Sequence, residues 1–139
     1  MAQPRVIGIL AEDAGAWWPE LGGWIAAAVD RDGMMGLDDV KSAVANREMQ
    51  LWAVLDDARP VGACVTEISA FPKARVLSAV AVGGRGAARW IAALDAALSR
   101  YGDAHDCTKF NAPVARRGWR PLARALGWRE TAAYWKDLG

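Results

Sequence analysis

The chain has 139 residues, 53% of them hydrophobic and 24% charged, and a formal net charge of +1 at pH 7. This composition is typical of a folded globular protein and excludes a disordered chain. The balanced charge gives no reason to expect a nucleic acid or a membrane surface as partner, and no apolar run reaches the ~20 residues that span a bilayer. We therefore expect one domain over residues 1–139. Cys64 and Cys107 lack metal-ligand spacing, so no metal site is expected.

The first third of the chain predicts one strand and two helices. The expected elements are a strand over Arg5–Ala11, a helix over Ala14–Asp30 and a short helix from Gly36 to about Asn46. Apolar residues recur at helical spacing in the longer helix, but Pro19 and Gly22-Gly23 are expected to interrupt it. Trp17 and Trp18 are adjacent, so a helix turns them about 100° apart, and one of them is a candidate surface anchor for a partner.

Three strands joined by short turns follow. They are expected over Met49–Leu55, Val61–Ile68 and Arg75–Val82. Short connections imply an antiparallel meander. The first of the three is apolar without a break, which is typical of a central strand buried on both faces.

The last part of the chain returns to alternating elements. We expect a helix from Gly84 to about Tyr101, a strand over Cys107–Asn111, a basic connection over Pro113–Gly118, a short helix over Trp119–Leu126 and a final strand over Trp128–Lys136. This order predicts an α/β fold with a mixed sheet and helices packed on it.

A small glycine loop is the most informative motif. The strand ending at Val82 meets Gly83-Gly84-Arg85-Gly86, and an amphipathic helix follows directly. Strand, glycine loop and helix together present bare backbone N–H groups to a phosphate at the helix N-terminus. The alternative is a strand-to-helix turn that binds nothing.

Single side chains give weaker indications. Glu67, on an otherwise apolar strand, is the best candidate for a general base, and the alternative is a surface carboxylate. Glu48 and Glu130 are weaker candidates. His105 lies between two aspartates and is either a base or a solvated loop residue. Arg117, Arg120 and Arg124 share a helix face, which is either a partner-binding stripe or a solvated surface.

The element order and the loop after the fourth strand resemble the GCN5-related N-acetyltransferase (GNAT) superfamily over nearly the whole chain. In that family a Gln/Arg-x-x-Gly-x-Gly/Ala loop holds the pyrophosphate of acyl-CoA, and Gly83, Gly86 and Ala88 lie at the matching positions. Gly127-Trp128 matches a Gly-Phe pair near the family's C-terminus. The resemblance implies a twisted, mixed and mostly antiparallel sheet with helices on both faces. It also implies acetyl-CoA as the ligand of Val82, Gly83, Gly84, Arg85, Gly86, Ala87 and Ala88.

The chain departs from the family's pattern at three functional positions. Gly83 stands where the family usually has Gln or Arg, Ala123 where it has a tyrosine acid, and Arg116 near a frequent asparagine. These departures argue against acid catalysis by the family's usual route. Acetyl transfer to an amine of a small molecule or protein, with Glu67 acting directly or through water, is the alternative function.

A narrower resemblance favours a different function. The segment Ala115–Trp119 is similar to basic Gly-Trp segments in small GNAT-like proteins of tailed bacteriophages. It implies a non-catalytic structural or accessory component of a phage or prophage, with other virion or accessory proteins as partners. The expected location is the bacterial host cytoplasm or the virion, and homo-oligomer formation is left open.

Overall fold

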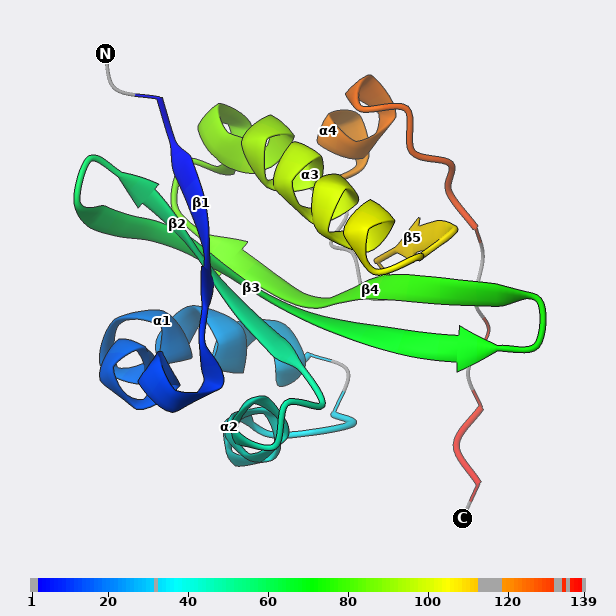
Figure 1. The fold of residues 1–139 in the computed structure, drawn as a ribbon, viewed down its shortest axis with the longest axis horizontal. Coiled ribbons are helices and arrows are strands. Elements are labelled where there is room, and N and C mark those ends of the chain that lie inside the picture. The colour runs from blue at the N-terminus through cyan, green and yellow to red at the C-terminus, as the bar shows by residue number, and fades with distance from the viewer. Residues whose placement is uncertain (1–2, 32, 113–118, 132–133, 135, 139) are drawn as a thin grey trace.

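The computed structural model describes residues 3–31, 33–112, 119–131, 134 and 136–138, and Figure 1 shows its fold. The elements follow in the order β1 (Arg5–Ile9), a 3-10 helix η1 (Ala11–Asp13), α1 (Ala14–Val29), α2 (Leu37–Ala45), β2 (Gln50–Asp56), β3 (Arg59–Phe71), β4 (Ala74–Gly84), α3 (Ala87–Ala104), β5 (Lys109–Asn111) and α4 (Arg120–Ala125). No helix in these ranges is long and apolar enough to cross a membrane.

The five strands form one sheet in the order β1-β2-β3-β4-β5. The first three pairings are antiparallel, as the short turns predicted, and β4 pairs with β5 in parallel. β3 and β4 are the longest strands, and their hairpin extends beyond the rest of the sheet (Figure 1). The predicted mixed, mostly antiparallel sheet is therefore confirmed.

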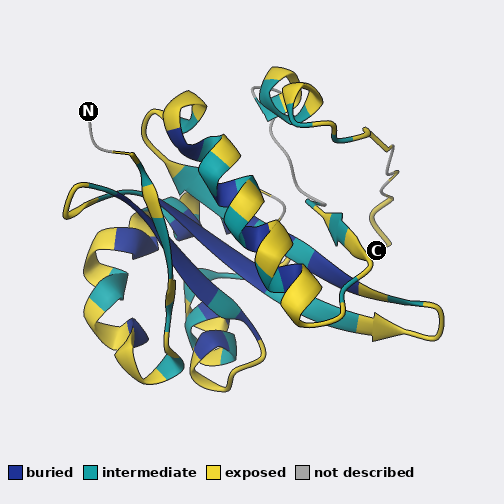
Figure 2. Ribbon diagram, turned by 45° about the horizontal axis from the view of Figure 1, so that its top comes forward, coloured by how far each residue is buried: buried dark blue, intermediate teal, exposed yellow. Residues whose placement is uncertain are grey.

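Helices cover both faces of the sheet, and each face has its own apolar core (Figures 1 and 2). Because side chains alternate along a strand, Leu51 and Ala53 of β2 face α1 and α2, whereas Trp52 and Val54 face α3. Burial on both faces explains why β2 is apolar without a break. The predicted α/β fold with helices on both faces is confirmed.

Helix α1 runs without interruption from Ala14 to Val29, so the expected break at Pro19 is wrong. A proline inside a helix costs roughly 3 kcal/mol, because it removes one backbone hydrogen bond and crowds the preceding turn. The buried face of α1 offsets this cost, since Leu21 and Ile25 are fully buried against the sheet. Gly22 packs beside the side chain of Leu37 and allows α2 to approach.

The expected final strand is also not found. Its described residues, which are 128–131, 134 and 136, lie outside any strand. Instead the chain turns at Gly127, which has φ +82°, and the backbone N–H of Trp128 donates to the Ala123 carbonyl at 3.0 Å. The Trp128 indole donates to Asp95 of α3 at 2.8 Å, and its ring meets Phe110 of β5 edge to face at 4.7 Å, so this segment packs on α3 and β5 by side chains without adding a strand.

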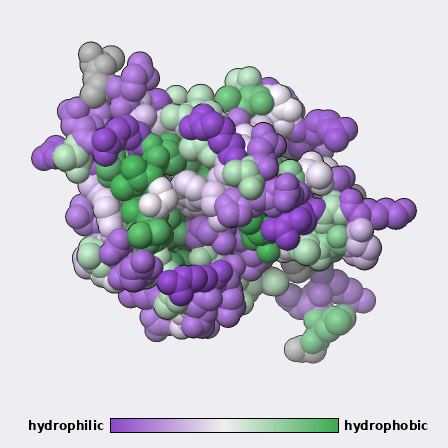
Figure 3. All heavy atoms as spheres, in the orientation of Figure 1, coloured by the Kyte–Doolittle hydropathy of each residue, from purple (hydrophilic) through white to green (hydrophobic). Residues whose placement is uncertain are grey.

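Hydrophilic residues cover most of the face seen in Figure 3, and apolar residues gather over β1. β1 is an edge strand, and Leu10, which follows it, has 62% of its surface exposed. Trp17 and Trp18 are both half-buried against the α1 and α2 core, so neither is a fully exposed anchor. The apolar surface of this face is thus centred on β1.

Candidate functional site

Strands β4 and β5 separate after a short stretch of pairing. Their parallel pairing covers only Val76–Ser78 of β4, and β4 continues to Gly84. Six residues of β4, Ala79–Gly84, therefore have no strand beside them on that edge within the described part of the chain. At the strand rise of about 3.3 Å per residue, this open edge is about 20 Å long.

A β-bulge marks the point where the strands separate. Val65 of β3 pairs with Ala81, but the next residue, Thr66, pairs with Ala79. Val80 is the extra residue, and both Val80 and Ala81 face the α1 and α2 core. An extra residue leaves its backbone groups outside the ladder and bends the strand, so the bulge turns the end of β4 away from β5.

The first two glycines of the loop are explained by packing. A Cβ on Gly83 would lie 2.9 Å from the Trp24 carbonyl oxygen of α1. A Cβ on Gly84 would lie 2.5 Å from the Gly62 Cα and closer still to the Val61 carbonyl oxygen. Gly84 also has φ +145°, a conformation that side chains with a Cβ rarely adopt. Both glycines let the end of β4 lie close to its neighbours, whether or not a ligand is present.

The loop is tied down by two hydrogen bonds at Arg85. Its backbone N–H donates to the Val61 carbonyl at 2.7 Å, and its carbonyl accepts a 2.7 Å bond from the Trp90 indole. Trp90 is 1% exposed, so this second bond joins the loop to the α3 core. The backbone of Arg85 is therefore satisfied within the protein.

The third glycine is different, because no packing demand explains it. Gly86 is the N-cap of α3 with φ +65°, and a Cβ there would meet nothing within 4 Å. Ala87 and Ala88 follow in the first helical turn, where backbone N–H groups lack helical partners and the helix dipole favours an anion. Arg85 is exposed, and Arg89 lies 3.6 Å from Asp56. Gly86–Ala88 is thus the part of the loop suited to a phosphate.

Glu67 lies away from this loop. It is half-buried on β3, opposite Ser78, and its side chain is on the α1 and α2 face of the sheet because its neighbours Thr66 and Ile68 face α3. Gly84 lies six positions after Ser78, about 20 Å along the strand. By contrast, Ser78 is only two residues from the bulge at Val80, about 7 Å. The candidate base and the candidate phosphate site therefore lie near opposite ends of the open β4 edge.

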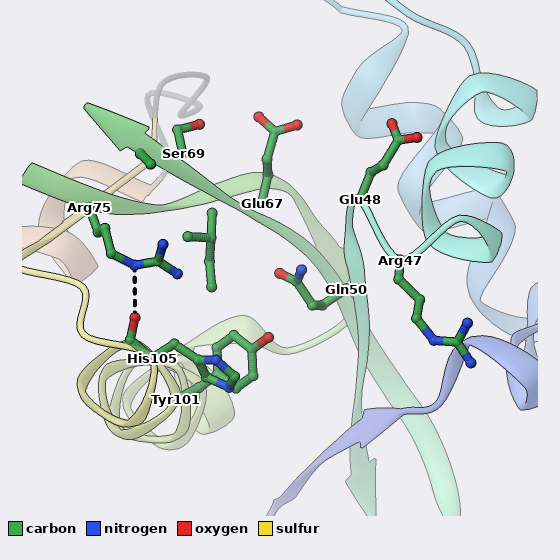
Figure 4. Close-up of a pocket in the computed structure, with 10 residues that line it drawn as sticks. Arg47, Glu48, Gln50, Glu67, Ser69, Arg75, Tyr101 and His105 are labelled. Carbon is green, nitrogen blue, oxygen red and sulfur yellow. Dashed lines mark hydrogen bonds between the residues drawn. The ribbon is translucent and has the colours of Figure 1, made fainter. Parts of the chain in front are cut away.

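Glu67 borders a polar surface pocket of about 640 Å³ (Figure 4). The residues that line it are Arg47, Glu48, Gln50, Glu67, Ile68, Ser69, Ala70, Arg75, Tyr101 and His105. Of these, the sequence suggested Glu67, His105 and, as a weaker candidate, Glu48 as functional residues. Gln50, Arg75 and Tyr101 were missed because they come from two strands and a helix that only the fold brings together.

Buried hydrogen bonds support one wall of this pocket. Thr66 is fully buried, accepts a 2.9 Å bond from the Trp52 indole and donates at 2.8 Å to the amide oxygen of Gln50. The Tyr101 ring meets Trp52 edge to face at 5.0 Å and lies 4.2 Å from the His105 ring. Burial raises the pKa of the Tyr101 phenol above its usual value, and the nearby Cys107 raises it further.

The other candidates do not gather at one centre. Arg120 pairs with Glu130 at 2.7 Å on the exposed surface of α4, and Arg116 and Arg117 lie outside the described residues. The position of the family's usual tyrosine is occupied by Ala123 on α4. Within the described ranges, no group of three His, Cys, Asp or Glu side chains could hold a metal ion.

Cys64 is expected to resist thiol reagents in the folded protein, whereas Cys107 should react. Cys64 is fully buried, and burial raises the pKa of its thiol, so the reactive thiolate is scarce. Cys107 is partly exposed. Counting thiols with a chromogenic disulfide before and after unfolding should give one and then two. Cys107→Ser should abolish the native-state reaction, and fast labelling of both thiols would contradict the burial of Cys64.

No family model and no curated protein matches the chain, but solved structures match it over nearly its whole length. An aminoglycoside acetyltransferase from an uncultured soil metagenomic sample has a TM-score of 0.73 at 15% identity, covering 99% of each chain. A ribosomal-protein-alanine N-acetyltransferase from Brucella melitensis biovar Abortus 2308 has a TM-score of 0.70 at 16% identity, covering 98% of this chain and 99% of that one.

A third solved structure is described with a ligand. It is a predicted acetyltransferase with acetyl-CoA from Clostridium acetobutylicum, with a TM-score of 0.68 at 14% identity, covering 99% of this chain and 96% of that one. At such identities the likeness is one of fold. The five-stranded sheet, the helices on both its faces and these matches together show that the chain has the fold of the GNAT acetyltransferases.

Proposed function

We propose that the protein binds acyl-CoA along the open edge of β4 and transfers the acyl group to an amine. The observation that carries this proposal is the separation of β4 from β5, which leaves Ala79–Gly84 without a strand partner. A pantetheine arm contains amide groups, which can pair with an open strand edge as a peptide does. The structure with acetyl-CoA from Clostridium acetobutylicum supports the assignment through its similar fold.

The residues of the loop fit the phosphate end of such a ligand. The space beside Gly86 is open, and Ala87 and Ala88 begin a helix of 18 residues. Backbone N–H groups at a helix N-terminus favour anions by up to about 2 kcal/mol. Arg85 adds an exposed positive charge beside them. We assign the pyrophosphate to this position.

The other end of the open edge fits the acyl group and the acceptor. Acyl-CoA supplies an activated thioester, and the attacking amine must lose a proton during transfer. Glu67 pairs with Ser78, about 7 Å along the strand from the bulge at Val80, which the length of its side chain and one water molecule can together cover. We assign Glu67 as the base that takes this proton through water.

Acetyl-CoA titration by calorimetry tests the proposal. We expect saturable binding, and we expect Gly86→Glu to weaken it more than about tenfold, because a carboxylate there repels the pyrophosphate. Gly33→Glu is the matched control, since Gly33 also has φ +65° and nothing within 4 Å of its Cβ direction. It should bind acetyl-CoA as the unsubstituted protein does. No heat of binding at millimolar acetyl-CoA would overturn the proposal.

A non-catalytic role in an assembly, such as a virion or accessory component of a tailed phage, is the second candidate. It is favoured by Ala123 at the position of the usual tyrosine acid and by the internal partners of the Arg85 backbone. The apolar surface over the edge strand β1, with Leu10 exposed, suits contact with a partner or a second copy. Failure to bind acetyl-CoA, together with stable incorporation into a larger particle, would favour this role.

A further inference from the structure

The outer edge of β1 is an open strand edge at the surface of the molecule. β1 is the first strand of the sheet and pairs with β2 on one side, and no strand of the described residues lies on its other side. Figures 1 and 3 share one orientation, in which β1 lies in front of the other strands and the apolar residues over it are in view. Backbone N–H and C=O groups along this edge can therefore pair with another extended segment.

The sequence of β1 lacks the features that usually prevent such pairing. Natural edge strands are often protected by proline, by lysine or by a β-bulge. The strand RVIGI contains neither proline nor lysine, and its register with β2 is regular from Arg5 to Ile9. Leu10 continues the extended backbone with φ −63° and ψ 146°, and 62% of its surface is exposed. The segment from Arg5 to Leu10 is thus an uninterrupted edge with one charged residue, at its start.

The order of residues in this segment is complementary to itself. When two copies pair as antiparallel strands centred on Gly8, the two glycines lie opposite each other. Side chains alternate along a strand, so Val6 and Leu10 lie on the α3 face of the sheet, and Ile7 and Ile9 lie on the α1 and α2 face. A two-fold axis perpendicular to the sheet keeps the matching faces of both copies on the same side. Val6 then lies beside Leu10 of the second copy, and Ile7 beside Ile9.

The charges at the two ends of the segment favour the same partner. Arg5 begins the segment, and Glu12 and Asp13 follow it in η1. In the pairing centred on Gly8, Arg5 lies opposite Ala11 of the second copy, next to the two acidic residues of that copy. Arg5 and Asp13 are exposed, and neither forms an ion pair within the described ranges. Two-fold symmetry makes this contact twice, which favours a second copy over an unrelated strand.

We propose that the protein forms a symmetric dimer by antiparallel pairing of two β1 strands, which joins the two five-stranded sheets into one. The pairing satisfies backbone groups of both edges, and the contact of Val6 with Leu10 removes exposed apolar surface from water. So small an interface binds weakly, and we expect a dissociation constant of about 10–100 µM. The dimer does not depend on acyl-CoA, because β1 and the open edge of β4 lie on opposite sides of the sheet.

Sedimentation equilibrium of the full chain tests the dimer. Between about 10 µM and about 1 mM protein, the mean mass should rise from that of one chain toward that of two. A single chain throughout this range would overturn the proposal.

Leu10→Lys tests the position of the interface. Leu10 is exposed, so the substitution leaves the fold intact, but in the dimer it places a charge against Val6 of the second copy. We expect the dissociation constant to rise more than about tenfold, with acetyl-CoA binding unchanged. Phe71→Lys, at the tip of the β3–β4 hairpin, is the matched control, since Phe71 is 60% exposed and lies far from β1. A dimer that survives Leu10→Lys, or is lost in Phe71→Lys, would overturn the proposal.

Hydrogen exchange distinguishes strand pairing from other contacts at this edge. In an edge strand every second amide points away from the sheet and exchanges readily. We expect these amides of β1 to become protected as the protein concentration rises, while amides at the turn between Phe71 and Ala74 keep their rate. Dimer formation without new protection in β1 would overturn the pairing.

A charge reversal at Arg5 tests the register. Arg5→Glu should weaken association about tenfold at low salt and less at about 1 M salt, because it removes two attractive contacts and places like charges together. Arg59→Glu, at the exposed start of β3, makes the same change of net charge and should dimerise normally. Equal association of the two variants at low salt would overturn the register centred on Gly8.

Discussion

Gly84→Ala is expected to lower the free energy of unfolding by about 4 kcal/mol. The new Cβ would overlap the backbone at Val61 and Gly62, and backbone moves less easily than the end of a side chain. Overpacking costs about 1–3 kcal/mol, and holding a non-glycine residue at φ +145° adds a similar amount. Urea unfolding followed by circular dichroism measures the change.

Gly86→Ala is the matched control for this prediction. Gly86 also has positive φ, but its Cβ direction is open, so only the backbone conformation is penalised. The expected loss is about 1–2 kcal/mol. Similar losses for the two variants would show that close packing does not explain Gly84.

Trp90→Ala is expected to cost about 3–5 kcal/mol of unfolding free energy, the range measured for buried aromatic residues. Trp90 is 1% exposed and packs on Gly62 and Gly84, and its indole N–H donates a hydrogen bond to the Arg85 carbonyl. The same substitution should also speed hydrogen exchange at the Arg85 amide, because the end of β4 would no longer be shielded from solvent by the indole ring.

Trp128→Ala provides the comparison. Trp128 also donates one hydrogen bond, to Asp95, but it is only half-buried, between α3 and Phe110 of β5. Its removal should cost less than half as much, and the Arg85 amide should exchange at the rate of the unsubstituted protein. Equal destabilisation by the two substitutions would contradict the prediction that Trp90 contributes more to stability than Trp128.

Much of the fold was predictable, because the pattern of apolar residues along the sequence indicates which faces of each element are buried. The unbroken apolar run of β2 predicted a strand covered on both faces, and short turns predicted antiparallel neighbours. The expected strand over Trp128–Lys136 was wrong, because the contacts of Trp128 with Asp95 and Phe110 join residues far apart in the sequence and give no local signal. The interruption of α1 was wrong for a related reason: local propensity at Pro19 was outweighed by burial against the sheet.

The site was only partly predictable. The loop was found because glycines next to a strand end are a local signal, but the sequence did not distinguish Gly84, needed for packing, from Gly86, which has open space. The polar pocket gives no local signal. Arg75 and Tyr101 are 26 positions apart, and they line one pocket only because β4 and the end of α3 lie side by side.

The contact of Trp90 with two glycines on different strands has a consequence for how such proteins diverge. The Trp90 indole fits only where positions 62 and 84 carry no side chain, and these two glycines pair across β3 and β4. A smaller residue at position 90 would make room for a side chain at position 62. A side chain at position 84 would still overlap the backbone of β3. These residues are therefore expected to be inherited together. Their joint presence would identify a relative in which the loop is anchored in the same way, even where the rest of the sequence has changed.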